Sequence, residues 1–122
     1  MKLALAVFED RISVIFDNSK QLQIVLIKDN FLKNRKEVYF NTLCIVKMIE
    51  MLKEESVEII ICGAISEYMQ NIIERNGIKV IPWISGSVQN VLDAWMNGTL
   101  EKLVMPGCCR LYAKKYVSSN FK

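Results

Sequence analysis

The sequence has no histidine among its 122 residues. Histidine is the usual base of catalytic triads and a common zinc ligand, so histidine-dependent hydrolysis of either kind is excluded. No cysteine pair has the Cys-x-x-Cys spacing, and the adjacent Cys108 and Cys109 cannot easily chelate one tetrahedral ion, so a closed structural zinc site is not expected. Two-metal nuclease chemistry is not expected either, because the strand that would supply a carboxylate ends in Cys62.

Long apolar runs and a strong charge of one sign are also missing. The longest apolar stretch, residues 59–65, is far shorter than the roughly 20 residues of a membrane-spanning helix, so no membrane partner is expected. The net charge of +3 is spread among acids, which predicts no nucleic-acid partner but allows an anionic ligand. Without an export signal, the four cysteines are expected to be free thiols in a reducing cytoplasm.

The length and the apolar content indicate one domain. A chain of 122 residues that is 52% hydrophobic can build one core of ordinary size but not two. We therefore expect a single domain over residues 1–122, with its core in about 1–100 and a C-terminal tail over about 101–122.

The first third of the chain has the alternating pattern of strands. Apolar residues alternate or run together over 3–8, 12–16 and 22–27, and the polar turns between them are short. Such short turns predict a three-strand antiparallel meander. The almost wholly charged segment 33–37 is predicted to be a solvated loop.

The pattern then alternates between helix and strand. The predicted helices begin behind Asn41 or Thr42, behind Ser66 and behind Ser87, and the predicted strands span 57–62 and 78–82. The order β-β-β-α-β-α-β-α predicts an α/β fold with a five-stranded mixed sheet of the ribonuclease H-like kind.

In such sheets a ligand binds at the carboxyl ends of the parallel strands, where loops 8–10, 62–64 and 83–87 are predicted to converge. Two helices begin there, at Gly63-Ala64 and at Gly86-Ser87, and their backbone N–H groups would favour an anion. The alternative is that these four residues are ordinary loop and capping residues.

Sulfur is the second candidate feature, because thiolates bind soft metals and iron–sulfur clusters. The candidate ligands are Cys62, at the end of a predicted strand, and Cys108 and Cys109, in a tail that also carries Arg110 and two lysines. Cys62 could equally be a small core residue, and so could Cys44, within a predicted helix.

Several segments together resemble the dinitrogenase iron-molybdenum cofactor biosynthesis family, the small carrier proteins and cluster-binding domains of nitrogenase assembly. The segments that carry the resemblance are residues 1–6, 57–65, 77–80, 86–88 and 97–100. The resemblance implies a ribonuclease H-like fold, an anionic iron–sulfur or iron–molybdenum type cluster as ligand, and cluster-assembly proteins as partners. It implies a non-catalytic binding or carrier protein rather than an enzyme.

The chain departs from the family at one segment. Residues 15–19 stand where the family commonly has His-Phe-Gly and a small residue, and Ile15 replaces the histidine that contacts the cofactor. The resemblance places Asn18 and Ser19 among the cofactor contacts. Cysteines or backbone donors take over the missing role, or the chain binds something else, or it binds nothing metallic. The alternative function is therefore a regulatory or protein-interaction domain that has lost the ligand.

Overall fold

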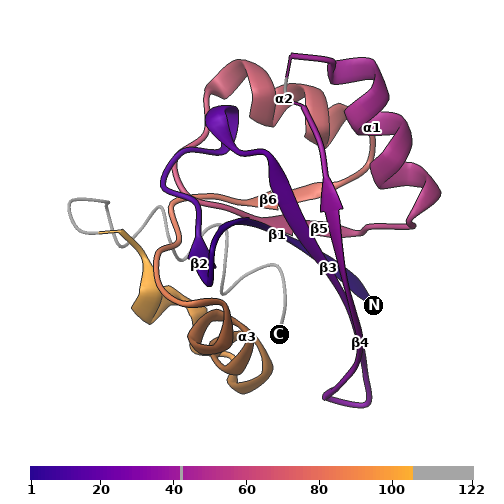
Figure 1. Ribbon diagram of the computed structural model, residues 1–122. Coiled ribbons are helices and arrows are strands. Elements are labelled where there is room, and N and C mark those ends of the chain that lie inside the picture. Colours follow the sequence, from indigo (N-terminus) through magenta and orange to yellow (C-terminus); the bar gives the residue numbers. More distant parts are fainter. Residues whose placement is uncertain (42, 106–122) are drawn as a thin grey trace.

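The computed structural model describes residues 1–41 and 43–105, which form a mixed sheet with helices on both faces (Figure 1). The strands are β1 (Lys2–Phe8), β2 (Arg11–Ile12), β3 (Gln21–Lys28), β4 (Phe31–Tyr39), β5 (Ile59–Ile61) and β6 (Lys79–Ile81). The sheet order is β4-β3-β1-β5-β6, and the short β2 pairs with β1. The β1–β3 and β3–β4 pairs are antiparallel, whereas β1–β5 and β5–β6 are parallel. The predicted α/β class and mixed sheet are confirmed.

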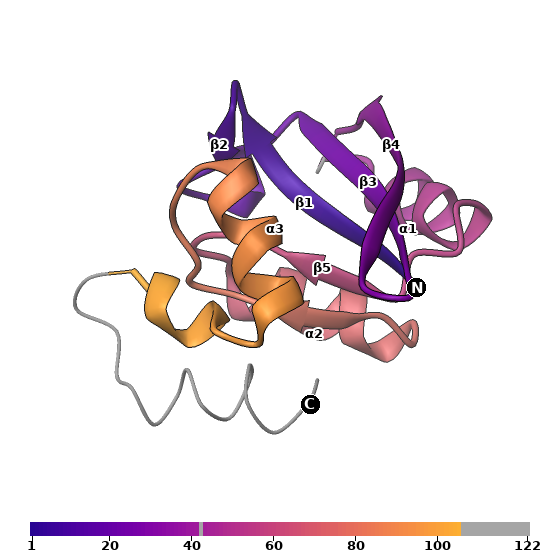
Figure 2. The ribbon, with the colours of Figure 1, turned by 90° about the horizontal axis from the view of Figure 1, so that it is seen from below.

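The helices are α1 (Ile45–Glu54), α2 (Glu67–Arg75) and α3 (Val88–Asn97), with 3₁₀ turns η1 (Phe16–Asn18) and η2 (Leu100–Leu103). Helices α1 and α2 cover one face of the sheet, and α3 with η2 covers the other (Figure 2). Among the described residues, no helix has the length and apolar content that crossing a membrane requires.

Strand β1 separates two cores, because its side chains point alternately to the two faces. Leu3, Leu5 and Val7 pack with α3, while Ala4 and Ala6 face α1 and α2. All five are buried, as expected of a central strand covered on both sides.

Local capping signals placed two of the three helices correctly. The Ser66 and Ser87 hydroxyl oxygens accept the N–H groups of Met69 and Asn90, at 3.2 and 3.1 Å. Helix α1 differs: it begins after Cys44 with no side-chain cap. The predicted cap Asn41 instead accepts the Leu43 N–H in the preceding turn, at 2.9 Å, so that prediction is wrong. The alternative cap, residue 42, lies outside the described residues.

The third strand of the predicted meander is confirmed as β3, but it pairs directly with β1, and the prediction of the second strand is wrong. Of the expected strand 12–16 only Ile12 pairs with β1, together with the preceding Arg11. The chain then turns so that Phe16 is buried and packs on Phe40, with their ring centroids 5.7 Å apart. The segment 33–37 is not a loop but the middle of β4, which follows β3 through a tight turn at residues 29–30, both with positive φ. Because most of β4 is exposed, its sequence shows no apolar alternation.

Candidate binding site at the sheet rim

A segment of the chain, residues 11–16, crosses the carboxyl ends of β1 and β5 and forms the rim of the sheet. It is held to the loop after β5 by two hydrogen bonds: the Ala64 N–H donates to Val14 O at 2.8 Å, and the Phe16 N–H donates to Ala64 O at 2.7 Å. The bridge between Ile15 and Ala64 is parallel. The rim is therefore made by residues about fifty positions apart in the sequence.

The loop before α3 joins the same rim from the other side. The Ile12 N–H donates to Gly86 O at 2.9 Å, and the Val88 N–H, the first of α3, donates to Asp10 O at 2.8 Å. The three loops predicted to converge do meet there.

Gly63 lies at the tightest point of this rim. A Cβ atom built on it would lie 2.5 Å from Val14 O, nearer still to Ser13 O, and 2.8 Å from the Met105 side-chain methyl. Real Cβ atoms do not approach so closely, so only glycine fits without a shift of backbone. The last described residue, Met105, is thus packed against the rim.

The segment 103–105 lies along the loop after β6. The Met105 N–H donates to Trp83 O at 2.7 Å, and the Ser85 N–H donates to Leu103 O at 2.9 Å. Trp83 and Glu9 both have positive φ, 67° and 56°, which L-residues seldom adopt. Such backbone strain often accompanies functional loops.

The N-terminus of α2 already holds a carboxylate of the chain itself. Asp17 Oδ1 accepts the Ser66 N–H at 3.0 Å, and Asp17 Oδ2 accepts the Ser66 hydroxyl at 2.7 Å. A negative side chain at this end of a helix interacts favourably with the helix dipole. An external anion would compete with Asp17 at this place.

Beside these contacts the rim carries a depression of about 300 Å³, here called the rim depression, lined by Phe8, Arg11, Ile12, Ser13, Val14, Ile15 and Asn18. Its apolar walls are open: Phe8 is 64%, Val14 65% and Ile15 43% exposed. Arg11, also exposed, supplies the one charge among the lining residues.

The residues predicted as ligand contacts have different places at this rim. Asn18 lines the rim depression, whereas Ser19 is buried and its hydroxyl donates to Ile15 O at 3.0 Å. The four predicted residues of the helix starts, Gly63, Ala64, Gly86 and Ser87, lie in the loops that meet at the rim. Their role as anion contacts stays a prediction. Phe8 belongs to the loop 8–10 that was predicted to reach the rim, but sequence reasoning named neither Phe8 nor Arg11 nor Val14 as a ligand contact.

The cysteines do not gather at the rim depression. Cys62 is fully buried, and burial, with a smaller contribution from the charge of Asp17, raises the pKa of its thiol. Cys44 is exposed at the start of α1. Cys108 and Cys109 lie outside the described residues. Within residues 1–41 and 43–105, no three His, Cys, Asp or Glu side chains are placed to hold a metal ion.

The structure is thus an α/β domain whose mixed sheet has a small depression at the carboxyl ends of its parallel strands, a common place for a binding site in such sheets. The sequence profile of the dinitrogenase iron-molybdenum cofactor family matches residues 1–98, and the chain belongs to this family.

Solved structures share the fold of this chain. "PH0822" superimposes with a TM-score of 0.73 at 21% identity, over 82% of this chain and 93% of that one. A "putative dinitrogenase" from Methanocaldococcus jannaschii has a TM-score of 0.69 at 27% identity, over 82% and 91% of the two chains. A "putative NifB protein" from Thermotoga has a TM-score of 0.63 at 20% identity, over 80% and 89%. A search of curated proteins finds no match.

Proposed function

We propose that this chain is a non-catalytic binding or carrier protein that takes up an anionic metallocluster, of the iron–sulfur or iron–molybdenum type, at the rim depression. The strand order, with parallel strands on one side of β1 and antiparallel strands on the other, supports the ribonuclease H-like scaffold proposed for it. The observation that carries the proposal is the position of Arg11 beside exposed Val14 and Ile15, where three loops of a cofactor-family fold meet.

The charge of the rim depression suits an anion. Its lining contains one arginine and no acidic side chain. A guanidinium keeps its charge at every physiological pH and donates in a planar fork, so Arg11 can hold an anionic ligand by hydrogen bonds as well as by charge.

The soft donors are proposed to be the thiolates of Cys108 and Cys109. Three residues of extended chain span at most about 11 Å, so Cys108 can reach the rim from Met105, which contacts Gly63 there. Cys62 is left out of this donor set, because its thiol would have to lose a proton inside the apolar core.

The test is anaerobic reconstitution of the full chain with ferrous iron and sulfide, followed by its visible absorption. We expect a bound chromophore that falls at least tenfold in the C108S/C109S double variant and weakens in R11E. The matched control is C44S, which removes the exposed cysteine at the start of α1 and should load like the wild type. A wild type that never gains a chromophore, or a double variant that loads equally, would refute the carrier function.

A second candidate is a regulatory or protein-interaction domain of the same fold without the cluster. It is favoured by Ile15 at the position of the family histidine and by Asp17 at the start of α2, where an anion would otherwise bind. If the chain has this second function, the wild type, R11E and C108S/C109S all gain no chromophore on reconstitution.

A further inference from the structure

A second surface lies along β4, the outermost strand of the sheet next to β3. Consecutive residues of a strand turn their backbone N–H and C=O groups to opposite sides. The Phe40 N–H points inward, since it donates to Lys20 O at 3.0 Å, whereas the Arg35 N–H bonds its neighbour's side chain, Asn34 Oδ1, at 2.8 Å. Glu37 and Tyr39 occupy the same alternate positions of the strand as Arg35, so their backbone groups also point away from β3.

These outward groups are available for pairing. Within the described part of the chain, no residue bonds the backbone N–H of Glu37 or Tyr39. Residues 31–37 are all exposed, and Tyr39 is 77% exposed. An edge strand with free donors and acceptors is a template for an added strand.

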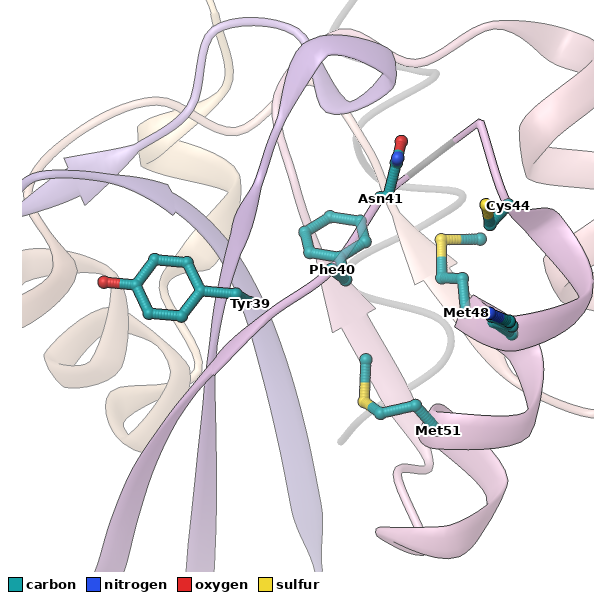
Figure 3. A pocket seen from close by; sticks show the side chains of 7 residues that line it. Tyr39, Phe40, Asn41, Cys44, Met48 and Met51 are labelled. Carbon is teal, nitrogen blue, oxygen red and sulfur yellow. The ribbon is translucent and has the colours of Figure 1, made fainter.

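A groove runs beside this edge, between the end of β4 and helix α1. This edge groove, about 420 Å³, is lined by Tyr39, Phe40, Asn41, Cys44, Lys47, Met48 and Met51. Phe40, Met48 and Met51 point into the space between strand and helix, whereas Tyr39 points to the other side of the sheet (Figure 3). A strand added to β4 would place every second side chain on the α1 side, where flexible methionines can adapt to an apolar residue.

The basic residues of this surface favour an acidic partner. Strand β4 carries Lys33, Arg35 and Lys36 against a single acid, Glu37, whose Oε2 accepts the Gln21 side-chain amide at 2.9 Å. Lys47 adds a further cation in the edge groove. Pairing β4 with a second copy of itself would bring like charges together, which disfavours a homodimer here. Acidic side chains complement the same surface.

We propose that β4 and the edge groove bind an extended acidic segment of a partner protein by strand addition. The partner's backbone pairs with Glu37 and Tyr39, an apolar side chain lies between Phe40 and Met51, and its carboxylates face Arg35 and Lys47. Main-chain bonds supply affinity in this mode, while the groove and the charges supply specificity. This surface is separate from the rim depression, so the proposal does not depend on a cluster.

Fluorescence polarisation of the full chain with labelled octapeptides tests this. The probes have a central leucine flanked by aspartates and glutamates, and the matched set has lysines in place of the acids. We expect the acidic peptides to bind at least tenfold more tightly, and their affinity to fall with salt. E37P removes one outward N–H without touching the β3–β4 ladder, and should weaken binding at least tenfold. E37Q keeps that N–H and should bind at least as well as the wild type.

A second pair of variants keeps the test independent of the proline. K47E reverses the charge in the edge groove, and K53E makes the same change on α1 at an exposed residue that does not line it. K47E should weaken acidic peptides several-fold, and K53E should do so less. The proposal is overturned if no acidic peptide binds, if the lysine peptides bind equally, or if folded E37P binds like the wild type. A wild-type dimer in sedimentation that E37P dissociates would also overturn it, since a second copy would then occupy β4.

Discussion

The rim, at the carboxyl ends of β1 and β5, and the edge strand β4 belong to one sheet, yet their backbone groups differ in hydrogen bonding. At the rim, the N–H groups of Ala64, Ser66 and Val88 are bonded within the chain. At the β4 edge, no described residue bonds the N–H groups of Glu37 and Tyr39. These three groups are not available to the ligand proposed at the rim, which would meet side chains such as Arg11, whereas the partner proposed at β4 can use the backbone itself.

The same difference predicts that the rim contributes more to the stability of the fold than the β4 edge does. Contacts at the rim join segments far apart in sequence, as Asp17 and Ser66 do across 49 positions, so they hold the tertiary structure together. Strand β4 is mostly exposed, and its strand pairing is local to the β3–β4 hairpin. Substitutions at the rim should therefore lower the free energy of unfolding more than substitutions at the β4 edge do.

The largest effect is expected at Gly63. Replacing it by alanine forces the carbonyls of Ser13 and Val14 to move and should lower the free energy of unfolding by about 3 kcal/mol. Gly77, with φ of 84° but nothing within 4 Å of an added Cβ, is the control: G77A should cost about 1 kcal/mol, from backbone conformation alone. Urea unfolding followed by circular dichroism measures both, and an equal loss would show that the rim is not tightly closed.

The next effect is expected at Asp17. D17A removes the acceptor of both the Ser66 N–H and its hydroxyl, together with a charge at the start of α2, and should cost about 2 kcal/mol. D17N keeps an oxygen acceptor and should cost less. Thermal unfolding of the two variants would contradict this account if D17A were as stable as the wild type.

Because of Cys62, the free energy of unfolding should depend on pH in the alkaline range. Because burial raises the pKa of its thiol, the folded state keeps the proton that the unfolded chain releases above its ordinary pKa of about 8.5. The stabilisation is complete below that pH and is lost as pH rises, by about 1.4 kcal/mol at pH 9.5. Urea unfolding of wild type and C62A at pH 7.5 and 9.5 should show a steeper loss in the wild type; parallel losses would contradict it.

The smallest effect is expected near β4. Lys36 Nζ lies 2.9 Å from Glu55 Oε1, and this hydrogen bond, against a smaller opposing desolvation, lowers the pKa of Glu55. The pair should contribute at most about 0.5 kcal/mol, since it is exposed. This contribution is present above the ordinary glutamate pKa and is lost as pH falls below it. K36Q should therefore resemble the wild type in thermal unfolding at neutral pH, and a loss above 1 kcal/mol would show that the edge is structural.

Sequence patterns predicted those parts of the fold that depend on local signals. The continuous apolar run around β5 and the serine caps of α2 and α3 need only neighbouring residues, and the structure places them as expected. Strand β4 was missed because its exposed faces impose no apolar alternation. The segment after Ile12 has the alternation of a strand, yet its backbone is hydrogen-bonded to the loop at Ala64. No local sequence pattern predicts this pairing between distant segments.

The candidate site was predicted less well for the same reason. The convergence of loops at the carboxyl ends of β1 and β5 follows from the strand order, but the walls of the rim depression follow from how residues 11–16 cross that edge. Arg11 is one of sixteen lysines and arginines in the sequence, and no local pattern distinguishes it from the others. The path of residues 11–16 across the sheet rim brings Arg11 to the rim depression together with Phe8 and Val14.

The contrast between a closed rim and an open edge is tested most directly by hydrogen exchange of single backbone amides, measured by NMR on the full chain without ligand. The amides of Ala64 and Val88 should exchange slowly, because each is hydrogen-bonded across the rim. Those of Glu37 and Tyr39 should exchange near the rate of an unstructured peptide, while the inward amides of Lys36 and Val38 are protected. Fast exchange at Ala64 and Val88, or protection at Glu37 and Tyr39, would contradict the account.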